Sequence, residues 1–218
     1  MPAFAAAIAL GFRYLETDVQ ATSDGVLVAF HDDDLSRTCG RPGLISELPW
    51  SEVATARVDG KEPIPLFEDL LTTFPDCRIN VDCKTDAAVQ PLIESLQRTD
   101  ALDRVCVGSF SHARLRRLRS ALGSRLCTSM SPIEVARWRF GIPSSAALVA
   151  QVPLRQGIVP VVTRRTVDRA HRRGIGVHVW TIDEPAEMLR LLELRVDGIM
   201  TDRPSVLKQV MVQRGEWA

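Results

Sequence analysis

Two carboxylates with a spacing suited to cation binding lie early in this 218-residue chain. Glu16 and Asp18 occur in FRYLETDV, a run whose alternation predicts a strand over residues 12–19. Side chains at positions i and i+2 of a strand project from one face, so these carboxylates repel each other unless they share a cation or a proton. Hard divalent cations prefer such oxygen ligands. The alternative is a solvated strand face on which arginine pairs with the carboxylates.

A second pair with the same spacing ends the strand-like run RINVDCK at residues 78–84. The side chains of Asp82 and Lys84 point the same way, so they could form an internal ion pair. Alternatively, Asp82 is a third metal ligand, and Lys84 presents its ammonium group to a phosphate. The spacing alone favours the ion pair.

One histidine and one tryptophan lie at the ends of other strand-like runs. His31 follows VLVAF, and the unperturbed pKa of histidine, about 6.5, suits proton transfer near neutral pH. Trp180 ends VHVW, where its indole could pack on an alkyl or glycerol group. The alternatives are a structural or surface histidine and a tryptophan packed in the core.

The elements that must position these residues alternate along the chain. Strand-like runs and helical patterns of about ten to fifteen residues follow one another, which indicates βαβ units and a parallel sheet. An apolar helix at residues 2–11, a hairpin turn at 23–25 and a short helix capped by Ser46 come first. The later helical patterns lie at residues 66–74, 86–98, 111–122, 132–141, 165–174, 184–194 and 204–212.

Counting the strand at residues 12–19, we expect about seven main strands, whereas a TIM (β/α)8 barrel has eight. A helix opens the chain, so the first strand is the one expected to be missing. The predicted fold class is therefore α/β, of the TIM-barrel type. We expect one domain over residues 1–218, with a hairpin and loop insertion at about residues 20–65.

Composition narrows the function classes. The chain is 45% hydrophobic and 25% charged, which is typical of a globular domain, and its formal net charge is zero. That balance argues against nucleic acid as a partner, and no apolar run reaches the roughly 18 residues of a membrane span. The five cysteines are scattered and odd in number, which favours a reduced, cytoplasmic location.

Taken in order, the motifs resemble the glycerophosphodiester phosphodiesterase family. The stretch AFAAAIALGFRYLETDVQATSDGVLVAFHDDDLSRT is similar to the family signature: an AF-x-x-A-x-x-x-G helix, the ExD strand, a T-x-DG hairpin and HD-x-x-L-x-RT. The resemblance continues through IPLFEDLL, INVDCK, the SF after RVCVG, GVHVWTID and VDGIMTDRP. It covers nearly the whole chain in the correct order.

The resemblance implies metal-dependent hydrolysis of glycerophosphodiesters to sn-glycerol 3-phosphate and an alcohol. Glu16, Asp18 and Asp82 are then ligands of Mg²⁺ or Ca²⁺, with Asp82 where the family has glutamate. His31 is then one of two catalytic histidines. Lys84 would face the phosphate, and Trp180 would line the substrate pocket.

The sequence also departs from the family pattern. In the family, a first strand ending in His-Arg and a loop with Pro-Glu-Asn precede the AF helix, which here follows Met1 directly. We therefore expect impaired activity and self-association through open barrel edges. A start codon assigned too far downstream is favoured over a truncated gene or a genuine short variant. The alternative function is a non-catalytic barrel that binds a metal and a phosphorylated ligand, and hydrolysis of intact phospholipid ranks last.

Overall fold

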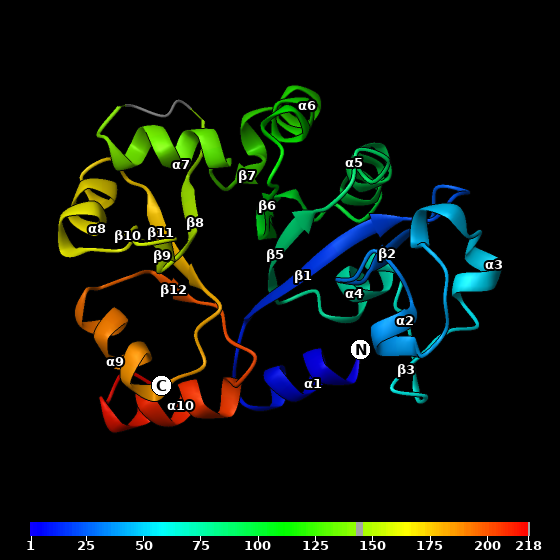
Figure 1. Ribbon diagram of the computed structural model, residues 1–218, viewed down its shortest axis with the longest axis horizontal. Helices are drawn as coiled ribbons and strands as arrows, with labels where there is room; N and C mark the ends of the chain where they lie inside the picture. The colour runs from blue at the N-terminus through cyan, green and yellow to red at the C-terminus, as the bar shows by residue number, and fades with distance from the viewer. Residues whose placement is uncertain (143–145, 218) are drawn as a thin grey trace. The chain divides into compact units, whose positions relative to one another are not determined.

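Side chains alternate between buried and more exposed over residues 14–19 of strand β1 (Tyr14–Ala21), and the last two residues of the strand are also buried. Leu15, Thr17 and Val19 are buried on one face, whereas Glu16 on the other face is exposed. The strand belongs to a five-stranded sheet of order β2-β1-β5-β6-β7 (Figure 1). The other strands are β2 (Leu27–Ala29), β5 (Arg78–Cys83), β6 (Val105–Gly108) and β7 (Cys127–Thr128).

Strands β1, β5 and β6 are parallel, so their carboxyl ends lie at the same edge of the sheet. Asp18 lies opposite Asp82 in the register of β1 and β5, and Asp82 lies opposite Gly108 of β6. This confirms the parallel pairing that the sequence predicts and brings two of the selected carboxylates to one edge.

The structure is a computed structural model that describes residues 1–142 and 146–217. Its contacts divide the chain into two units, one of Met1–Phe4 with Arg13–Cys127 and one of Ala5–Phe12 with Thr128–Ala218. The five-stranded sheet belongs mainly to the first unit. The expected single domain over residues 1–218, with its insertion, stays a prediction.

The chain between β1 and β5 forms a series of short helices and strands. β2 returns antiparallel to β1 through the turn at residues 22–25, as the T-x-DG motif predicts. Next come α2 (Ser36–Cys39), the 3₁₀ helix η1 (Ile45–Glu47), α3 (Trp50–Val53), β3 (Arg57–Val58) and β4 (Glu62–Pro63). Their apolar side chains pack in one cluster: Val28, Phe30, Leu35, Ile45, Val53, Ala56 and Ile64.

The prediction that Ser46 caps the short helix is wrong. Ser46 lies inside η1, and α3 begins after Pro49, whose side chain and missing N–H suit a helix start. The Trp50 N–H instead donates to Asp24 Oδ1, at 2.9 Å, from the hairpin turn. The Asp24 carboxylate therefore accepts the hydrogen bond at the start of α3 that the Ser46 hydroxyl was predicted to accept.

Amphipathic helices cover the sheet of the first unit. They are α4 (Phe67–Thr73), α5 (Val89–Arg98) and α6 (His112–Leu122), with the 3₁₀ helices η2 (Leu102–Arg104) and η3 (Gly123–Arg125) beside strands β6 and β7. In α5, the buried residues recur with the spacing of one helix face: Val89, Leu92, Ile93 and Leu96. The predicted helical pattern over residues 86–98 is therefore confirmed for residues 89–98, while residues 86–88 form the turn before the helix.

The second unit repeats the alternation of strand and helix. Parallel strands β8 (Val149–Pro153), β11 (Gly176–Trp180) and β12 (Gly198–Ile199) form a sheet of order β12-β11-β8, and β9 (Arg155–Gln156) pairs with β10 (Val159–Pro160). The helices are α7 (Pro132–Arg139), α8 (Arg164–His171), α9 (Pro185–Glu193) and α10 (Pro204–Gln213). Trp138, Val152, Val177 and Met188 are among the buried side chains of its core.

The apolar helix near the start of the chain is α1 (Pro2–Ala9). The helix ends at Ala9, and the chain turns at Gly11, whose φ of 107° and close approach to the ring of Trp217 both require glycine. The Lys208 ammonium donates to the Leu10 carbonyl at 2.8 Å, and Phe12 meets Trp217 edge to face at 4.8 Å between ring centroids. The segment after α1 therefore contacts Lys208 of α10 and Trp217, which follows that helix.

Candidate functional site

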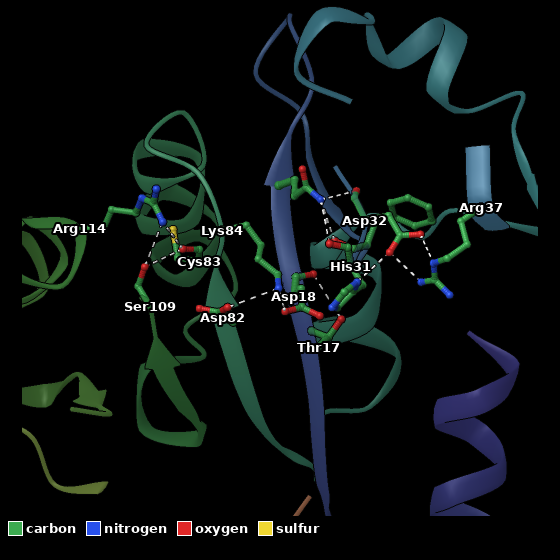
Figure 2. A network of polar contacts seen from close by, with 12 residues as sticks. Thr17, Asp18, His31, Asp32, Arg37, Asp82, Cys83, Lys84, Ser109 and Arg114 are labelled. Atoms are coloured by element: carbon green, nitrogen blue, oxygen red, sulfur yellow. Dashed lines mark hydrogen bonds and ion pairs between the residues drawn. The ribbon is translucent and has the colours of Figure 1, made fainter. Parts of the chain in front are cut away.

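The carboxyl ends of β1 and β5 hold a cation between two carboxylates. The Lys84 ammonium lies 2.9 Å from Asp18 Oδ1 and 3.6 Å from Asp82 Oδ2 (Figure 2). The three side chains are largely buried, between 12% and 23% exposed. Because Asp18 and Asp82 are register partners, their proximity follows directly from the parallel pairing of the two strands.

Burial and charge have opposite effects on the protonation of this cluster. Burial raises the pKa of Asp82 above its ordinary value, and the Lys84 charge only partly offsets that rise. Burial would lower the pKa of Lys84, but the hydrogen bond and charge of Asp18, with the charges of Asp82 and Glu16, raise it above its ordinary value. Lys84 is therefore a stable cation at neutral pH.

Glu16 contributes negative charge to this cluster from a more exposed position. It precedes Asp18 by two residues on the same face of β1 and lies opposite Asn80 in the register. Asp18 and Asp82 offer hard oxygen donors that already hold one cation, the Lys84 ammonium, so their chemistry fits a divalent ion. Within the described residues, however, no three His, Cys, Asp or Glu side chains lie close enough together to hold a metal ion.

His31 follows β2 and contacts a carboxylate that the sequence analysis did not select. Its Nδ1 lies 2.8 Å from Asp32 Oδ1, and Arg37 donates to both oxygens of Asp32, at 2.8 and 2.7 Å. The hydrogen bond from Arg37, with a further one from His31, lowers the pKa of Asp32, so this carboxylate is ionised and can only accept. The Nδ1 proton therefore points to Asp32, and Nε2 is left for proton transfer.

The loop that carries His31 is tied to β1 by backbone contacts. The Phe30 N–H donates to the Asp18 carbonyl at 3.0 Å. The buried Gln20 amide donates to the carbonyls of Phe30, His31 and Asp32, at 3.3, 3.3 and 2.5 Å. The His31 side chain itself is 68% exposed, so solvent and ligands can reach its ring.

Trp180 lies in the second unit. It is the last residue of β11, is partly exposed and is the register partner of Pro153 in β8. Three residues later, Asp183 accepts from the Thr201 hydroxyl at 2.8 Å and from the Asp202 N–H at 2.9 Å. This contact links the WTID and MTDRP motifs, and the role of Trp180 as a substrate contact stays a prediction.

Three of the residues predicted from the sequence, Asp18, Asp82 and Lys84, therefore lie together in the structure. Asp32 and Arg37 were not predicted as site residues, although both are fixed positions of the HD-x-x-L-x-RT motif. Their five-residue separation is explained by the short helix α2, which carries Arg37 back to Asp32. The opposite charges of Asp32 and Arg37 within this motif were the sequence signal that could have predicted their contact.

Comparison with known proteins shows the family of the chain. The model of the glycerophosphoryl diester phosphodiesterase family matches residues 1–206. The chain belongs to this family. It is 41% identical to the Mycobacterium tuberculosis protein named probable glycerophosphodiester phosphodiesterase 2, over 100% of the chain and 86% of that relative. It is 26% identical to a glycerophosphodiester phosphodiesterase of Caldanaerobacter subterraneus, over 98% and 91% of the two chains.

Solved structures match the fold as well. A phosphodiesterase of Oleispira antarctica, solved in complex with the product sn-glycerol-3-phosphate, has a TM-score of 0.80 at 19% identity, over 96% and 89% of the two chains. A glycerophosphodiester phosphodiesterase of Parabacteroides distasonis has a TM-score of 0.80 at 20% identity, over 97% and 89%. The predicted TIM-barrel class of fold and the assignment to phosphodiesterases are confirmed.

No helix within residues 1–142 and 146–217 is long and apolar enough to cross a membrane. The predicted cytoplasmic location and the predicted self-association stay predictions.

Proposed function

We propose that the chain hydrolyses glycerophosphodiesters to sn-glycerol 3-phosphate and an alcohol, with a divalent cation, Mg²⁺ or Ca²⁺, as cofactor. The Asp18–Lys84–Asp82 cluster carries the proposal. It combines an ammonium group with hard oxygen donors at the carboxyl edge of β1 and β5, where TIM barrels carry their catalytic residues. The substrate class is supported by the names of the relatives and by the product in the Oleispira structure.

Each selected residue has a distinct part in this proposal. Glu16, Asp18 and Asp82 would hold the divalent cation, which supplies charge stabilisation to the phosphoryl oxygens and lowers the pKa of a bound nucleophile. Lys84 places its ammonium against the anionic phosphodiester. Trp180 would line the substrate pocket, as the resemblance of GVHVWTID to the family motif implies.

His31 is the proton-transfer residue. Its Nδ1 is directed at Asp32, which leaves Nε2 to take a proton from the attacking oxygen or to give one to the leaving oxygen. Asp32 in turn is held by Arg37, so the ring has one favoured orientation although its surface is exposed.

Metal removal tests this proposal. Hydrolysis of glycerophosphocholine is followed by enzymatic detection of sn-glycerol 3-phosphate, before and after EDTA treatment and after the return of Mg²⁺ or Ca²⁺. We expect activity to be lost with EDTA and restored by one of the ions, and Asp82→Asn to weaken binding of that ion in calorimetry. Full activity in EDTA would remove the metal from the proposal.

The same assay also addresses the expected weakness of this chain and the alternative function. The Mycobacterium tuberculosis relative provides the reference rate. A measurable rate below that reference agrees with the expectation of impaired activity. Binding of sn-glycerol 3-phosphate with no turnover would instead favour a non-catalytic barrel.

A further inference from the structure

A serine and an arginine outside the selected residues contact the backbone of the candidate site. Ser109 directly follows β6, and Arg114 lies in the first turn of α6. The Ser109 hydroxyl donates to the Cys83 carbonyl at 2.8 Å, and Arg114 Nη1 donates to the same oxygen at 3.3 Å (Figure 2). Ser109 is buried, and the Arg114 side chain is 21% exposed. Two donors thus converge on one carbonyl beside Lys84.

These donors fix one side of the peptide that joins Cys83 to Lys84. On the other side, the Lys84 N–H donates to the Val19 carbonyl of β1 at 3.2 Å. A peptide is a rigid plane, so holding both its C=O and its N–H sets its orientation. That orientation determines the direction in which the Lys84 side chain leaves the backbone.

Arg114 also holds the loop on the far side of Lys84. Its Nε donates to Asp86 Oδ1 at 2.7 Å, while Nη1 remains on the Cys83 carbonyl. The rigid guanidinium fork can bind two acceptors at once, which a lysine ammonium on a flexible stem does poorly. The residues before and after Lys84 are therefore both attached to α6.

Cys83 takes part in this arrangement through its carbonyl, and its thiol donates to the Thr85 carbonyl at 3.6 Å. Burial raises the pKa of the Cys83 thiol to about 12, so it stays protonated at neutral pH. The side chain points away from Lys84 into the core, as expected for the alternation along β5.

We propose that Ser109 and Arg114 are positioning residues that direct the Lys84 ammonium to its place between Asp18 and Asp82. Neither residue touches the reacting atoms. The proposal rests on the proposed function, in which Lys84 faces the phosphate, and it assigns part of the phosphate affinity to two residues that act through the backbone.

A double-mutant cycle tests this proposal. Calorimetry measures the affinity for sn-glycerol 3-phosphate in the wild type, Arg114→Met, Lys84→Met and the double variant. Charge-assisted hydrogen bonds of this kind correspond to about tenfold to a hundredfold in affinity, so we expect a loss of that size in Arg114→Met. In the Lys84→Met background, the same change should cost little, because the group that Arg114 orients is absent.

One control variant and a second test variant separate positioning of Lys84 from general stability. Arg116→Met removes an exposed arginine from the same helix and should leave the affinity unchanged. Ser109→Ala removes only the donor of the shorter hydrogen bond to the Cys83 carbonyl and should also weaken binding. This variant tests the proposal if Arg114→Met does not fold. Unchanged affinity in the folded variants, or an equal loss in both Lys84 backgrounds, would overturn the proposal.

Amide hydrogen exchange provides a readout that does not depend on the proposed function. The Lys84 N–H should exchange faster in Arg114→Met than in Arg116→Met, because one side of its peptide is released. Equal rates would reject the positioning role even if the wild type hydrolyses glycerophosphodiesters. Conversely, faster exchange in a protein that neither binds nor hydrolyses them would support positioning of Lys84 while the proposed function fails.

Discussion

Lys84 satisfies two carboxylates that would otherwise be buried without a partner of opposite charge. Its ammonium is 2.9 Å from Asp18 and 3.6 Å from Asp82, and all three side chains are largely shielded from water. Removal of one member of such a group is costly because the remaining charges lose their compensation. Burial raises the pKa of Asp82 although the Lys84 charge lies beside it. The ion pair that the spacing alone favours is therefore present, and the phosphate-facing role of Lys84 stays a prediction.

The pairing of His31 with Asp32 leads to a prediction at the scale of single residues. His31→Ala should lower kcat by about 10²–10⁴, the usual contribution of a general acid or base. Asp32→Asn should lower kcat by a smaller factor, because the ring stays but its Nδ1 proton loses an ionised acceptor. Steady-state kinetics with glycerophosphocholine measure both effects.

The neighbouring Asp33→Asn is the matched control for Asp32→Asn, and it should keep the wild-type rate and the melting temperature. If Asp32→Asn turns over substrate like the control, then Asp32 does not orient the catalytic ring. If His31→Ala does so as well, His31 is not the proton-transfer residue.

Much of this arrangement could be predicted from the sequence where local spacing determines it. The alternation of FRYLETDV predicts the shared face of Glu16 and Asp18, and the parallel alternation of elements predicts that Asp82 joins them at one edge. The contacts of Arg114 with Cys83 and Asp86 could not be predicted in this way. They join residues about 30 positions apart, and only the tertiary fold brings the first turn of α6 beside the end of β5.

At the scale of elements, α4 and α5 are joined by a partly exposed ionic contact. Glu68 of α4 accepts from Ser95 at 2.9 Å and from Arg98 Nε at 3.0 Å, both on α5. The hydrogen bond from Arg98 lowers the pKa of Glu68, burial opposes it, and Ser95 adds to the lowering. Since the folded protein has the lower pKa, ionised Glu68 stabilises the fold at neutral pH.

This contact predicts a pH-dependent difference in stability. Glu68→Gln should melt below the wild type at pH 7. The difference should shrink as the pH falls below roughly 4, near and under the ordinary pKa of glutamate, because protonated Glu68 no longer stabilises the fold. Calorimetric scans over this range, with the exposed Asp69→Asn as control, measure it. A difference that stays constant down to pH 2.5, about 1.8 units below that pKa, would contradict the ionic explanation.

A second element-scale prediction concerns the attachment of the segment after α1. Trp217 packs against Gly11 and Phe12, and the Lys208 ammonium lies 5.4 Å from its ring centroid. Trp217→Ala should lower the free energy of unfolding by about 1–3 kcal/mol, less than for a fully buried tryptophan. Denaturant unfolding of this variant and of the exposed control Gln213→Ala measures the difference. Equal stability of the two would show that this attachment contributes nothing.

Local patterns also failed at this scale for an identifiable reason. Ser46 has the residue type of a helix cap, yet the helix starts after Pro49, and Asp24 from the hairpin accepts the first free N–H. The competing cap is 26 residues away. A tertiary contact of this kind overrides local propensity, and a single sequence contains no direct signal of it.

At the scale of the whole molecule, the motifs of the chain divide between its two units. The carboxylates, Lys84 and His31 belong to the first unit, and Trp180 with the WTID and MTDRP motifs belongs to the second. The family model spans both, as do the solved relatives that share the fold. The order of motifs along the chain was sufficient to predict this class of fold, because the strands and helices that carry them alternate as in other TIM-barrel proteins.

The identity of the product tests the central claim most directly. ³¹P NMR follows glycerophosphocholine incubated with the protein and the divalent cation that supports activity. We predict that the diester resonance is replaced by that of sn-glycerol 3-phosphate, and that Lys84→Met slows this replacement by more than tenfold, as expected when a charged contact with the phosphate is lost. A diester resonance that persists unchanged, or that converts to phosphocholine, would contradict the account.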